Sequence, residues 1–507
     1  MIPNRSSGIL AHISSLPSSY GIGDIGPASY DFLSFLQNCE QTYWQFLPTN
    51  PTNEHFDYSP YMANSAFAGN PLLISPDLLY ESGYIDKEDL HKKPALSPYI
   101  TEFSKVVPFK TTLLEKSFTV FQKNQPASYT TFIQNNTWLQ DYALFMVAKE
   151  LYKDQGWFAW PQKIALRDKT ALLELSAQNA SRINYYYFEQ FEYYRQWQLL
   201  REQCLKKGIL LFGDLPIYVS YDSVDVWAHQ ELFTLDPVTL RPTYVSGVPP
   251  DYFSATGQRW GNPLYDWQNT SPLVADGLVQ WWADRLSHLF TQVDVARIDH
   301  FRGFESYWSI PEENETAIDG KWLKGPGFQF FKELELQLGQ MNIIAEDLGI
   351  ITEEVVKLRD ALEYPGMKVL QFAFDGNPDN TFLPHNFDNP QCIVYTGTHD
   401  NDTTMGWFLS DKITDHQRSE IKLSANRFPN DNSPINRDLI YLAQSSISQL
   451  CIFPLQDVLG FGNDCKMNSP GEPKGNWRWR CGKEFLTREI ESYLAESTTR
   501  FGRNRIK

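Results

Sequence analysis

The feature that most constrains the fold is a series of short β-branched runs, most of which end in a polar or charged residue. Gly and Pro flank these runs and helical patterns separate several of them, so we expect strands rather than short helices. Strands that alternate with helices form a parallel sheet, and eight runs fit a closed (β/α)8 TIM barrel better than a doubly wound sheet. The runs are residues 8–14, 43–49, 209–214, 293–299, 342–347, 368–374, 392–400 and 450–457.

Helix signals between the runs support this alternation. Aromatic and Leu side chains recur at helical spacing over 187–200, and Gly208 fits the position just after a helix end. A second helical segment, 328–338, ends before Gly339, and a third begins at Thr352 with two glutamates in its first turn. Each segment precedes a predicted strand, which is the order that a parallel sheet requires.

The spacing of the runs is uneven. Roughly 160 residues separate the second run from the third, which is too long for a loop inside a compact domain. We therefore expect residues 1–52 and 205–507 to form the barrel with its loop insertions, and residues 53–204 to form an inserted, mostly helical subdomain. The predicted fold class is α/β, a (β/α)8 barrel with large, mostly helical insertions.

Composition narrows the function classes. The 507 residues include 44 Lys and Arg against 61 Asp and Glu, a net charge of −17, which argues against nucleic acid or an anionic membrane as the main partner. Six scattered cysteines without a C-x-x-C pair indicate neither a disulfide framework nor a zinc site. The sequence shows neither a leader segment nor an apolar run long enough to span a membrane, so we expect a cytoplasmic protein. Its oligomeric state stays unknown.

The run VDVARID (293–299) contains the first candidate acid. Strand side chains alternate, so Arg297 and Asp299 share one face. A guanidinium beside a carboxylate keeps the carboxylate ionised and oriented, which a nucleophilic acid requires. The same two residues also fit a buried ion pair that sets the register of the barrel, and the residues alone leave both interpretations open.

Two further acidic segments follow later strands. Glu346 and Asp347 are adjacent at the end of the fifth run, where one side chain can enter the mouth of the barrel and the other can cap a turn. His399, Asp400 and Asp402 cluster after the start of the seventh run. Their Asp-Asn-Asp triplet resembles an acidic metal-binding sequence, but a calcium loop needs more oxygen ligands at fixed spacing. Acids that converge on one rim of a barrel are the set that glycosyl transfer needs.

A glycine motif offers a different function. GIGDIG (21–26) matches the dinucleotide-binding pattern G-x-G-x-x-G, which would indicate an NAD-dependent oxidoreductase. That pattern requires a turn immediately after the strand, whereas the seven residues from Ser14 to Tyr20 intervene here. Pro27 fits the first position of a helix, so the glycines also fit an ordinary strand-to-helix connection.

Longer motifs occur in order along most of the chain. They include SSGILAHISSLPSSYGIGDIG (6–26), SPYMANSAFAGNPLLIS (59–75), GDLPIYV (213–219), GVPPDYFSATGQRWGNPLYDW (247–267), ARIDHFRGF (296–304), IIAEDLG (343–349), YTGTHDNDTT (395–404) and MNSPGEPKGNWRWR (467–480). Together they resemble the motifs of the 4-alpha-glucanotransferase family, also called the amylomaltase or disproportionating-enzyme family, which is glycoside hydrolase family 77. The GVPPDYFS…GNPLY stretch and TGTHDNDT are the most specific of them.

This resemblance implies an activity and a set of roles. It implies retaining transfer of alpha-1,4-glucan segments between glucans or maltooligosaccharides, with no metal and no organic cofactor. By motif, Asp299 corresponds to the nucleophile, Glu346 to the acid/base and Asp400 to the transition-state stabiliser. A retaining enzyme places its two reacting carboxyls roughly 5–5.5 Å apart. The residues expected to bind substrate or support the site are Arg297, His399, Asp214, Asp251, Tyr252, Phe253, Gln258, Trp260, Tyr61 and Asn468.

Two neighbouring functions stay open at this point. A plain alpha-glucan hydrolase would use the same acids, because the two reactions differ only in whether water or a sugar hydroxyl attacks. A non-catalytic carbohydrate-binding protein would bind the same ligands without turnover. The segment FLPTNPTNEHFDYSPY (46–61) replaces the LPL-x-P-T-G-like segment of the family, so the resemblance does not extend to glucan subsites near it.

Overall fold

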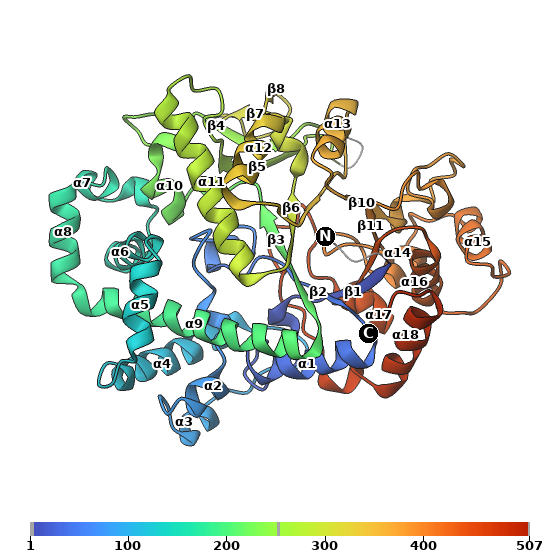
Figure 1. Cartoon of the computed structure of the whole chain (residues 1–507), viewed down its shortest axis with the longest axis horizontal. Coiled ribbons are helices and arrows are strands. Elements are labelled where there is room, and N and C mark those ends of the chain that lie inside the picture. The colour runs from blue at the N-terminus through green and yellow to red at the C-terminus, as the bar shows by residue number, and fades with distance from the viewer. Residues whose placement is uncertain (1–4, 251–253, 505–507) are drawn as a thin grey trace.

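Eight short parallel strands form the central sheet of the computed structural model, which describes residues 5–250 and 254–504. Their order is β10-β11-β12-β1-β2-β3-β6-β9, and each overlaps one predicted run, which confirms the (β/α)8 barrel (Figure 1). The strands are β1 (Ser6–Leu10), β2 (Tyr43–Gln45), β3 (Leu210–Pro216), β6 (Val295–Asp299), β9 (Ile343–Ala345), β10 (Gly366–Val369), β11 (Cys392–Tyr395) and β12 (Leu450–Pro454).

Several strands end earlier than the predicted runs. β11 ends at Tyr395, because the polar residues that follow leave the sheet and form a loop at the rim of the barrel. The two end strands meet where the Ala345 N–H of β9 donates to the carbonyl of Pro365, which precedes β10, at 2.9 Å. The Met367 N–H of β10 donates to the Asp347 carboxylate at 2.7 Å. These contacts close the sheet into a barrel.

Helices surround the strands in Figure 1. The crossover between β10 and β11 departs from this pattern, because residues 370–391, all of which the structure describes, form only the 3₁₀ turns Leu370–Phe372 and Pro384–Asn386. The helices are α1 (Pro27–Asn38), α2 (Pro76–Glu81), α3 (Lys87–His91), α4 (Phe103–Phe121), α5 (Ala127–Asn135), α6 (Trp138–Leu151), α7 (Gln162–Ala165), α8 (Lys169–Gln178), α9 (Ala180–Lys207), α10 (Val224–Ala228), α11 (Pro272–Gln292), α12 (Gly327–Leu338), α13 (Glu353–Ala361), α14 (Thr404–Leu409), α15 (Asp415–Ser424), α16 (Ile435–Ser445), α17 (Leu455–Leu459) and α18 (Arg488–Arg500).

The predicted helix ends are confirmed. α9 ends before Gly208, whose left-handed backbone (φ 61°) suits a residue without a Cβ atom. α12 ends before Gly339, and α13 begins directly after Thr352. Pro27 is the first residue of α1. These local signals act within one helical turn, which is why the sequence alone reveals them.

Residues 53–204 separate β2 from β3 and contain α2 to α8 and most of α9. The 28-residue helix α9 packs against α6 within this segment and against α1 beside the barrel. It runs past residue 204 and ends three residues before β3. The division of the chain into a barrel and an inserted subdomain stays a prediction, since α9 contacts both parts.

A second, antiparallel sheet was not predicted from the sequence. Its four strands follow the order β5-β4-β7-β8, and Val245, Ile310 and Ala317 form a small core of their own beside it. Two strands lie between β3 and β6, and the other two follow β6, so the sheet extends the loops at one side of the barrel (Figure 1). The strands are β4 (Tyr244–Val248), β5 (Gln258–Pro263), β7 (Ser306–Pro311) and β8 (Lys321–Lys324).

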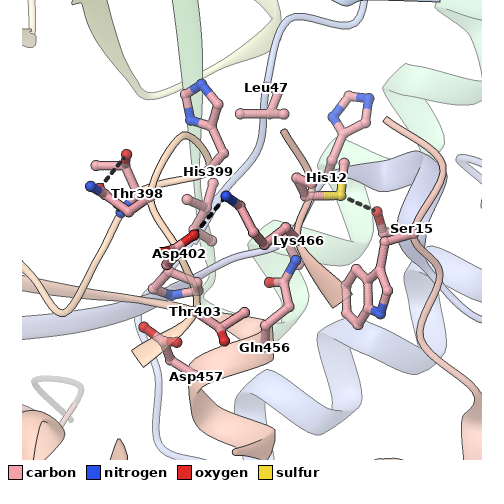
Figure 2. Close-up of a pocket in the computed structure, with 16 residues that line it drawn as sticks. His12, Ser15, Leu47, Thr398, His399, Asp402, Thr403, Gln456, Asp457 and Lys466 are labelled. Atoms are coloured by element: carbon pink, nitrogen blue, oxygen red, sulfur yellow. Dashed lines mark hydrogen bonds and ion pairs between the residues drawn. The ribbon is translucent and has the colours of Figure 1, made fainter. Parts of the chain in front are cut away.

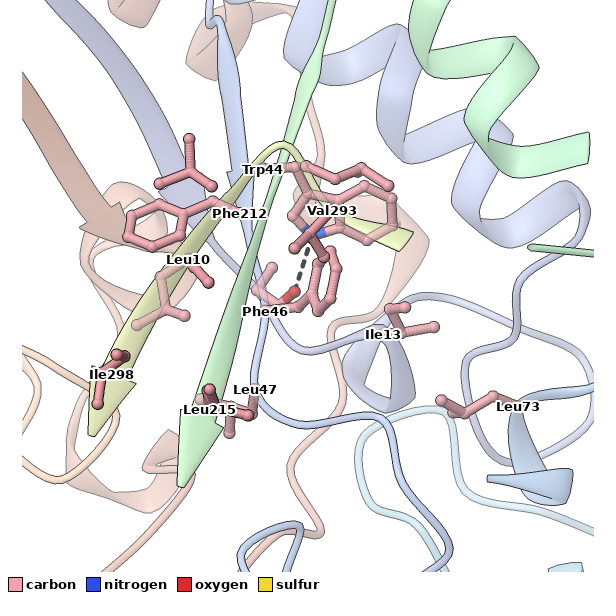
Figure 3. Packing of buried hydrophobic residues seen from close by; sticks show 14 of the residues in the cluster. Leu10, Ile13, Trp44, Phe46, Leu47, Leu73, Phe212, Leu215, Val293 and Ile298 are labelled. Carbon is pink, nitrogen blue, oxygen red and sulfur yellow. Dashed lines mark hydrogen bonds between the residues drawn. The ribbon is translucent and has the colours of Figure 1, made fainter. Parts of the chain in front are cut away.

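Large apolar side chains pack around β1, β2, β3 and β6. Figure 3 shows Trp44 and Phe46 beside Val293, and Leu10 near Ile298, all of them buried. The indole N–H of Trp44 donates to the carbonyl of Ala11 at 2.8 Å, so the polar atom of this buried ring is satisfied. Truncating such aromatic residues typically costs about 3–5 kcal/mol, so this packing stabilises the barrel.

None of the described helices combines the length and the apolar composition that a membrane crossing requires. The six cysteines are unpaired, and five of them are buried.

Gly8 of β1 provides a test of the barrel packing. A Cβ atom at this position would lie 2.5 Å from both Cβ and the backbone oxygen of Tyr43 in β2, which cannot move without breaking strand pairing. We expect Gly8→Ala to lower the free energy of unfolding by about 1–3 kcal/mol, measured by urea denaturation. Gly277→Ala in α11 is the control, because its Cβ would meet only the end of the Leu232 side chain. Equal stability of both variants would contradict this account.

Candidate active site

Arg297 is the buried centre of the site. It lies in β6, where the register of the sheet pairs it with Asp214 in β3. Its Nη1 donates to both carboxylate oxygens of Asp214, at 2.8 and 2.7 Å, and its Nη2 donates to Asp299 Oδ1 at 2.8 Å. The shared face predicted for Arg297 and Asp299 is therefore confirmed. Arg297 and Asp214 are only 4% and 5% exposed, so at this contact the guanidinium balances a carboxylate that water barely reaches.

Asp299 ends β6 with a side chain that is 32% exposed. Among the described residues, only its Oδ1 accepts a hydrogen bond, and Arg297 is the donor. Burial raises the pKa of the Asp299 carboxyl, and the cation of Arg297 opposes this rise, while Asp214 and Asp400 add to it. Direct contact with a guanidinium favours the carboxylate form and fixes its orientation.

Glu346 directly follows β9, the strand next to β6. Its Oε2 accepts from the His300 N–H at 2.8 Å and its Oε1 accepts from the Leu348 N–H at 3.0 Å. Burial raises the pKa of Glu346 to about 7; the nearby Asp299 adds to the rise, whereas Arg297 and the two backbone amides oppose it. Glu346 can therefore hold a proton near neutral pH, as a general acid must.

Asp400 lies in the loop after β11, a strand that only β10 separates from β9 in the closed barrel. Its Oδ2 lies 3.2 Å from His399 Nε2, and its Oδ1 accepts from Asn468 Nδ2 at 2.6 Å. Burial raises the pKa of Asp400, but His399 and Asn468 outweigh burial and lower the pKa to about 2. Burial lowers the pKa of His399, and Asp400 outweighs it in turn, so that pKa is raised. Asp400 is therefore anionic at neutral pH.

Tyr61 joins the two sides of the rim. Its hydroxyl donates to Asp214 Oδ2 at 2.6 Å and lies 2.8 Å from His399 Nε2. Its ring stacks on the His399 ring, with centroids 5.3 Å apart. The structure thereby brings seven of the predicted site residues into one unbroken series of polar contacts: Asp299, Arg297, Asp214, Tyr61, His399, Asp400 and Asn468.

The second sheet places two more predicted residues near this rim. Trp260 in β5 meets the ring of His300 edge-on, with centroids 4.8 Å apart. Its indole N–H donates to the side-chain oxygen of Gln258 at 3.3 Å. His300 directly follows Asp299, so Trp260 lies beside the strand end that carries the candidate nucleophile. Three predicted residues lie outside the described residues: Asp251, Tyr252 and Phe253.

The loop that carries His399 and Asp400 is fastened at both ends by one buried acid. Asp457, which is 1% exposed, accepts from the Thr396 hydroxyl at 2.6 Å and from the Thr404 N–H at 2.7 Å. Thr396 begins the loop and Thr404 ends it, so Asp457 fixes the span of the loop. This arrangement positions the two polar side chains between these ends.

Asp402 of the same loop is paired with a cation. Lys466 Nζ donates to Asp402 Oδ1 at 2.7 Å, beside a cavity of about 20 Å³ that has room for about one water molecule (Figure 2). Among residues 5–250 and 254–504, no group of three or more His, Cys, Asp or Glu side chains is arranged to hold a metal ion. The two aspartates of the Asp-Asn-Asp triplet thus bind protein side chains, Asn468 at Asp400 and Lys466 at Asp402.

The glycine motif packs against the protein itself. A Cβ at Gly23 would lie 1.9 Å from the carbonyl oxygen of Ile13, and a Cβ at Gly26 would lie 2.3 Å from Ser75 Oγ. These close approaches explain the glycines without a nucleotide. They favour the strand-to-helix interpretation of residues 21–26 over the dinucleotide site.

The segment that departs from the family motif, 46–61, contacts a distant part of the chain. Asp57 accepts from the Gly475 N–H at 2.7 Å, from the Asn476 N–H at 3.2 Å and from Arg478 Nη2 at 2.7 Å. Asp57 itself has a left-handed backbone (φ 49°). This sequence therefore stabilises its own version of the loop through one carboxylate.

Sequence reasoning missed the backbone groups that bind Glu346. The His300 and Leu348 amides carry no side-chain signal, and the left-handed backbone of His300 (φ 53°) is unusual for a residue with a side chain. It also missed His12, which lines the cavity near His399. Burial lowers the pKa of His12 to about 3, with His399 adding to the effect, so His12 is neutral. No spacing pattern in the sequence pointed to these three residues.

The fold and the site define a class of protein: a (β/α)8-barrel enzyme of the glycoside hydrolase type, with carboxyls of contrasting protonation at the carboxyl ends of its strands. The sequence profile described as 4-alpha-glucanotransferase matches residues 11–485. The chain belongs to this family, glycoside hydrolase family 77, and is therefore an enzyme of the 4-alpha-glucanotransferase type.

Full-length relatives share the sequence and the fold. A 4-alpha-glucanotransferase of Synechocystis is 45% identical over 99% of both chains, and one of Thermus thermophilus is 41% identical over 98% of this chain and 99% of its own. The structure of amylomaltase from Streptococcus agalactiae in complex with acarbose superposes with a TM-score of 0.94 at 37% identity, over 99% of this chain and 100% of that chain. Amylomaltase from Corynebacterium glutamicum, at 17% identity and a TM-score of 0.75, shares the fold, over 98% of this chain and 75% of that chain.

The charge balance around Arg297 yields a stability prediction. Arg297→Met leaves the buried Asp214 carboxylate without its cation, so we expect the free energy of unfolding at neutral pH to fall by about 3–5 kcal/mol in urea denaturation. Adding Asp214→Asn to this variant removes the uncompensated charge and should recover part of the loss. If the changes in the free energy of unfolding caused by Arg297→Met and Asp214→Asn were simply additive in the double variant, Arg297 would not stabilise Asp214.

Proposed function

We propose that this chain transfers alpha-1,4-glucan segments by a retaining mechanism with a covalent glucosyl intermediate on Asp299. The observation that carries the proposal is the contrast between two acids on neighbouring strands. Asp299 is bound by a guanidinium, whereas the hydrogen bonds to Glu346 from the described residues come from backbone amides. A guanidinium favours the charged form of the carboxyl it contacts more strongly than neutral amides do, which suits Asp299 to act as the nucleophile and Glu346 as the acid/base.

The first step breaks the donor glucan. An Asp299 oxygen attacks the anomeric carbon of the donor, the bond from that carbon to the glycosidic oxygen breaks, and Glu346 gives its proton to the departing oxygen. The reducing-end fragment leaves as a neutral sugar, and Glu346 becomes a carboxylate. Its pKa of about 7 suits this exchange, because a proton that is neither too tightly nor too weakly held can move in both directions.

The second step rebuilds the linkage. The 4-hydroxyl of an acceptor glucan, or of glucose, gives its proton to Glu346 and attacks the same anomeric carbon, and the ester bond to Asp299 breaks. Two inversions restore the alpha configuration, and Glu346 is again protonated. No group besides the two sugars is consumed or released.

Asp400 and His399 are proposed to hold the sugar ring as positive charge builds on it. Asp400 is anionic, with a pKa of about 2, and its two oxygens are held by His399 and Asn468. A fixed anion near the anomeric carbon stabilises a positively charged transition state without having to reorient. Tyr61 and Arg297 support this arrangement through Asp214.

Several observations support alpha-glucan oligosaccharides as ligands. The Streptococcus agalactiae amylomaltase, which shares this fold, was solved in complex with acarbose. In this chain, Trp260 presents a partly buried ring beside the rim, a surface on which sugar rings can stack. An aromatic wall that excludes water favours attack by a sugar hydroxyl over attack by water.

Removal of either proposed carboxyl tests the mechanism. We expect Asp299→Asn to lower transfer from maltotriose by at least about four orders of magnitude, because the amide is not a nucleophile. We expect Glu346→Gln to lower it by about 10²–10⁴-fold. The measurement is the formation of glucose and longer maltooligosaccharides from maltotriose.

Asp415→Asn is the matched control, since Asp415 is a fully exposed acid that pairs with Arg418 in α15. Its transfer rate should equal that of the unmodified chain, and thermal denaturation should show all three variants folded. Near-normal transfer by Asp299→Asn would refute the assignment of the nucleophile. Maltose and glucose without longer products would identify an alpha-glucan hydrolase instead.

The protonation of Glu346 predicts the alkaline limb of the pH profile. Its pKa is raised to about 7, and only the protonated form can act as the acid in the first step. We therefore expect kcat/KM for maltotriose to be high below this pKa and to fall as the pH rises through about 7. Rates that stay constant well above pH 7 would contradict the role of Glu346.

A further inference from the structure

Arg302 joins two loops at the rim of the barrel. It lies two residues beyond His300, in the 3₁₀ turn Phe301–Phe304 that follows β6, and is 5% exposed. Its Nη1 donates to the carbonyl of Ile350, which lies two residues beyond Leu348. One buried side chain therefore connects the turn after β6 to the loop after β9.

The two joined segments supply the backbone donors of Glu346. The His300 N–H binds one carboxylate oxygen at 2.8 Å, and the Leu348 N–H binds the other at 3.0 Å. The Phe301 N–H also donates to the backbone carbonyl of Glu346 at 3.2 Å. Leu348 lies in the same loop as Glu346, whereas His300 lies on the other segment, so the aim of the His300 N–H depends on how the two segments are held together.

The second sheet holds the Arg302 guanidinium in place. Its Cζ lies 3.8 Å from the ring centroid of Trp322 in β8, and its Nη2 donates to Ser306 Oγ of β7 at 3.3 Å. Trp322 packs edge-on against Trp308, with centroids 5.1 Å apart. A planar guanidinium can stack on an indole and donate sideways at the same time, which the ammonium of Lys cannot do.

We propose that Arg302 is a positioning residue: it ties the turn after β6 to the loop after β9, so that the His300 and Leu348 amides stay aimed at Glu346. Trp322 keeps Arg302 in this position and thereby couples the second sheet to the chemistry. The inference rests on the proposed function, in which Glu346 is the acid/base.

Loss of the contacts made by Arg302 should raise the pKa of Glu346. The charged groups that face Glu346 are Arg297 and Asp299 of β6, and Glu305 faces Arg302. Backbone N–H donors stabilise the carboxylate form, so donors that lose their aim allow the pKa of Glu346 to rise. The alkaline limb of the pH profile then moves to higher pH.

Arg302→Lys and Trp322→Leu test the inference, because both keep a cation at position 302. We expect Arg302→Lys to lower kcat for maltotriose about tenfold with a smaller change in KM, and to move the alkaline limb upward by about one pH unit. Trp322→Leu should move the limb in the same direction by less. It is also the second variant should Arg302→Lys fail to fold, since Trp322 is 38% exposed.

Arg418→Lys is the matched control. Arg418 in α15 also donates to backbone carbonyls, those of Phe408 and Ser410, and its guanidinium lies 5.9 Å from the ring centroid of Phe408. α15 lies at the right of Figure 1, far from β6. Its kinetics and its alkaline limb should match those of the unmodified chain.

The inference would be overturned if Arg302→Lys or Trp322→Leu folded and its alkaline limb had not moved, whether or not kcat had fallen. A merely structural role would lower activity without changing the titration of Glu346. Failure of the proposed function gives a different result. In that case Glu346→Gln would retain transfer, whereas the positioning role of Arg302 presupposes that this variant is inactive.

Discussion

The site depends on one buried guanidinium. Arg297 is enclosed by the barrel, and it is stable there only because Asp214 and Asp299 supply opposite charge at hydrogen-bond distance. The register between β3 and β6 brings Asp214 beside it, so strand pairing and charge balance impose the same arrangement. A shift of one residue in that register would turn Asp214 to the opposite face of the sheet and leave a buried cation partly unpaired.

A series of polar contacts links the Arg297–Asp214 pair to segments far apart in the sequence. Asp214 binds Tyr61 from the loop after β2, Tyr61 contacts His399 from the loop after β11, and Asp400 next to it binds Asn468. Each loop is therefore held by another loop as well as by its own strand. The pKa of about 2 for Asp400 results from this mutual support, since burial alone would raise it.

The sequence predicted what local patterns encode. The eight strands, the ends of α9, α12 and α13, and the shared face of Arg297 and Asp299 follow from periodicity and capping, which act over a few residues. The second sheet was missed because its central pairing, β4 with β7, joins segments more than 60 residues apart, on either side of β6. The amides of His300 and Leu348 were missed because a backbone donor leaves no trace in side-chain type. The resemblance to family motifs suggested roles that the patterns alone left open.

The single guanidinium also acts differently on two similar acids. Burial raises the pKa of both Asp299 and Glu346, and Arg297 opposes the rise at both, but it makes an ion pair only with Asp299. Neutral amides bind the two oxygens of Glu346 and stabilise its charge less than a cation would. A second cation within ion-pair distance of Glu346 would lower its pKa and favour the carboxylate form at neutral pH. Binding by backbone amides thus gives Glu346 a fixed orientation while it keeps its proton at neutral pH.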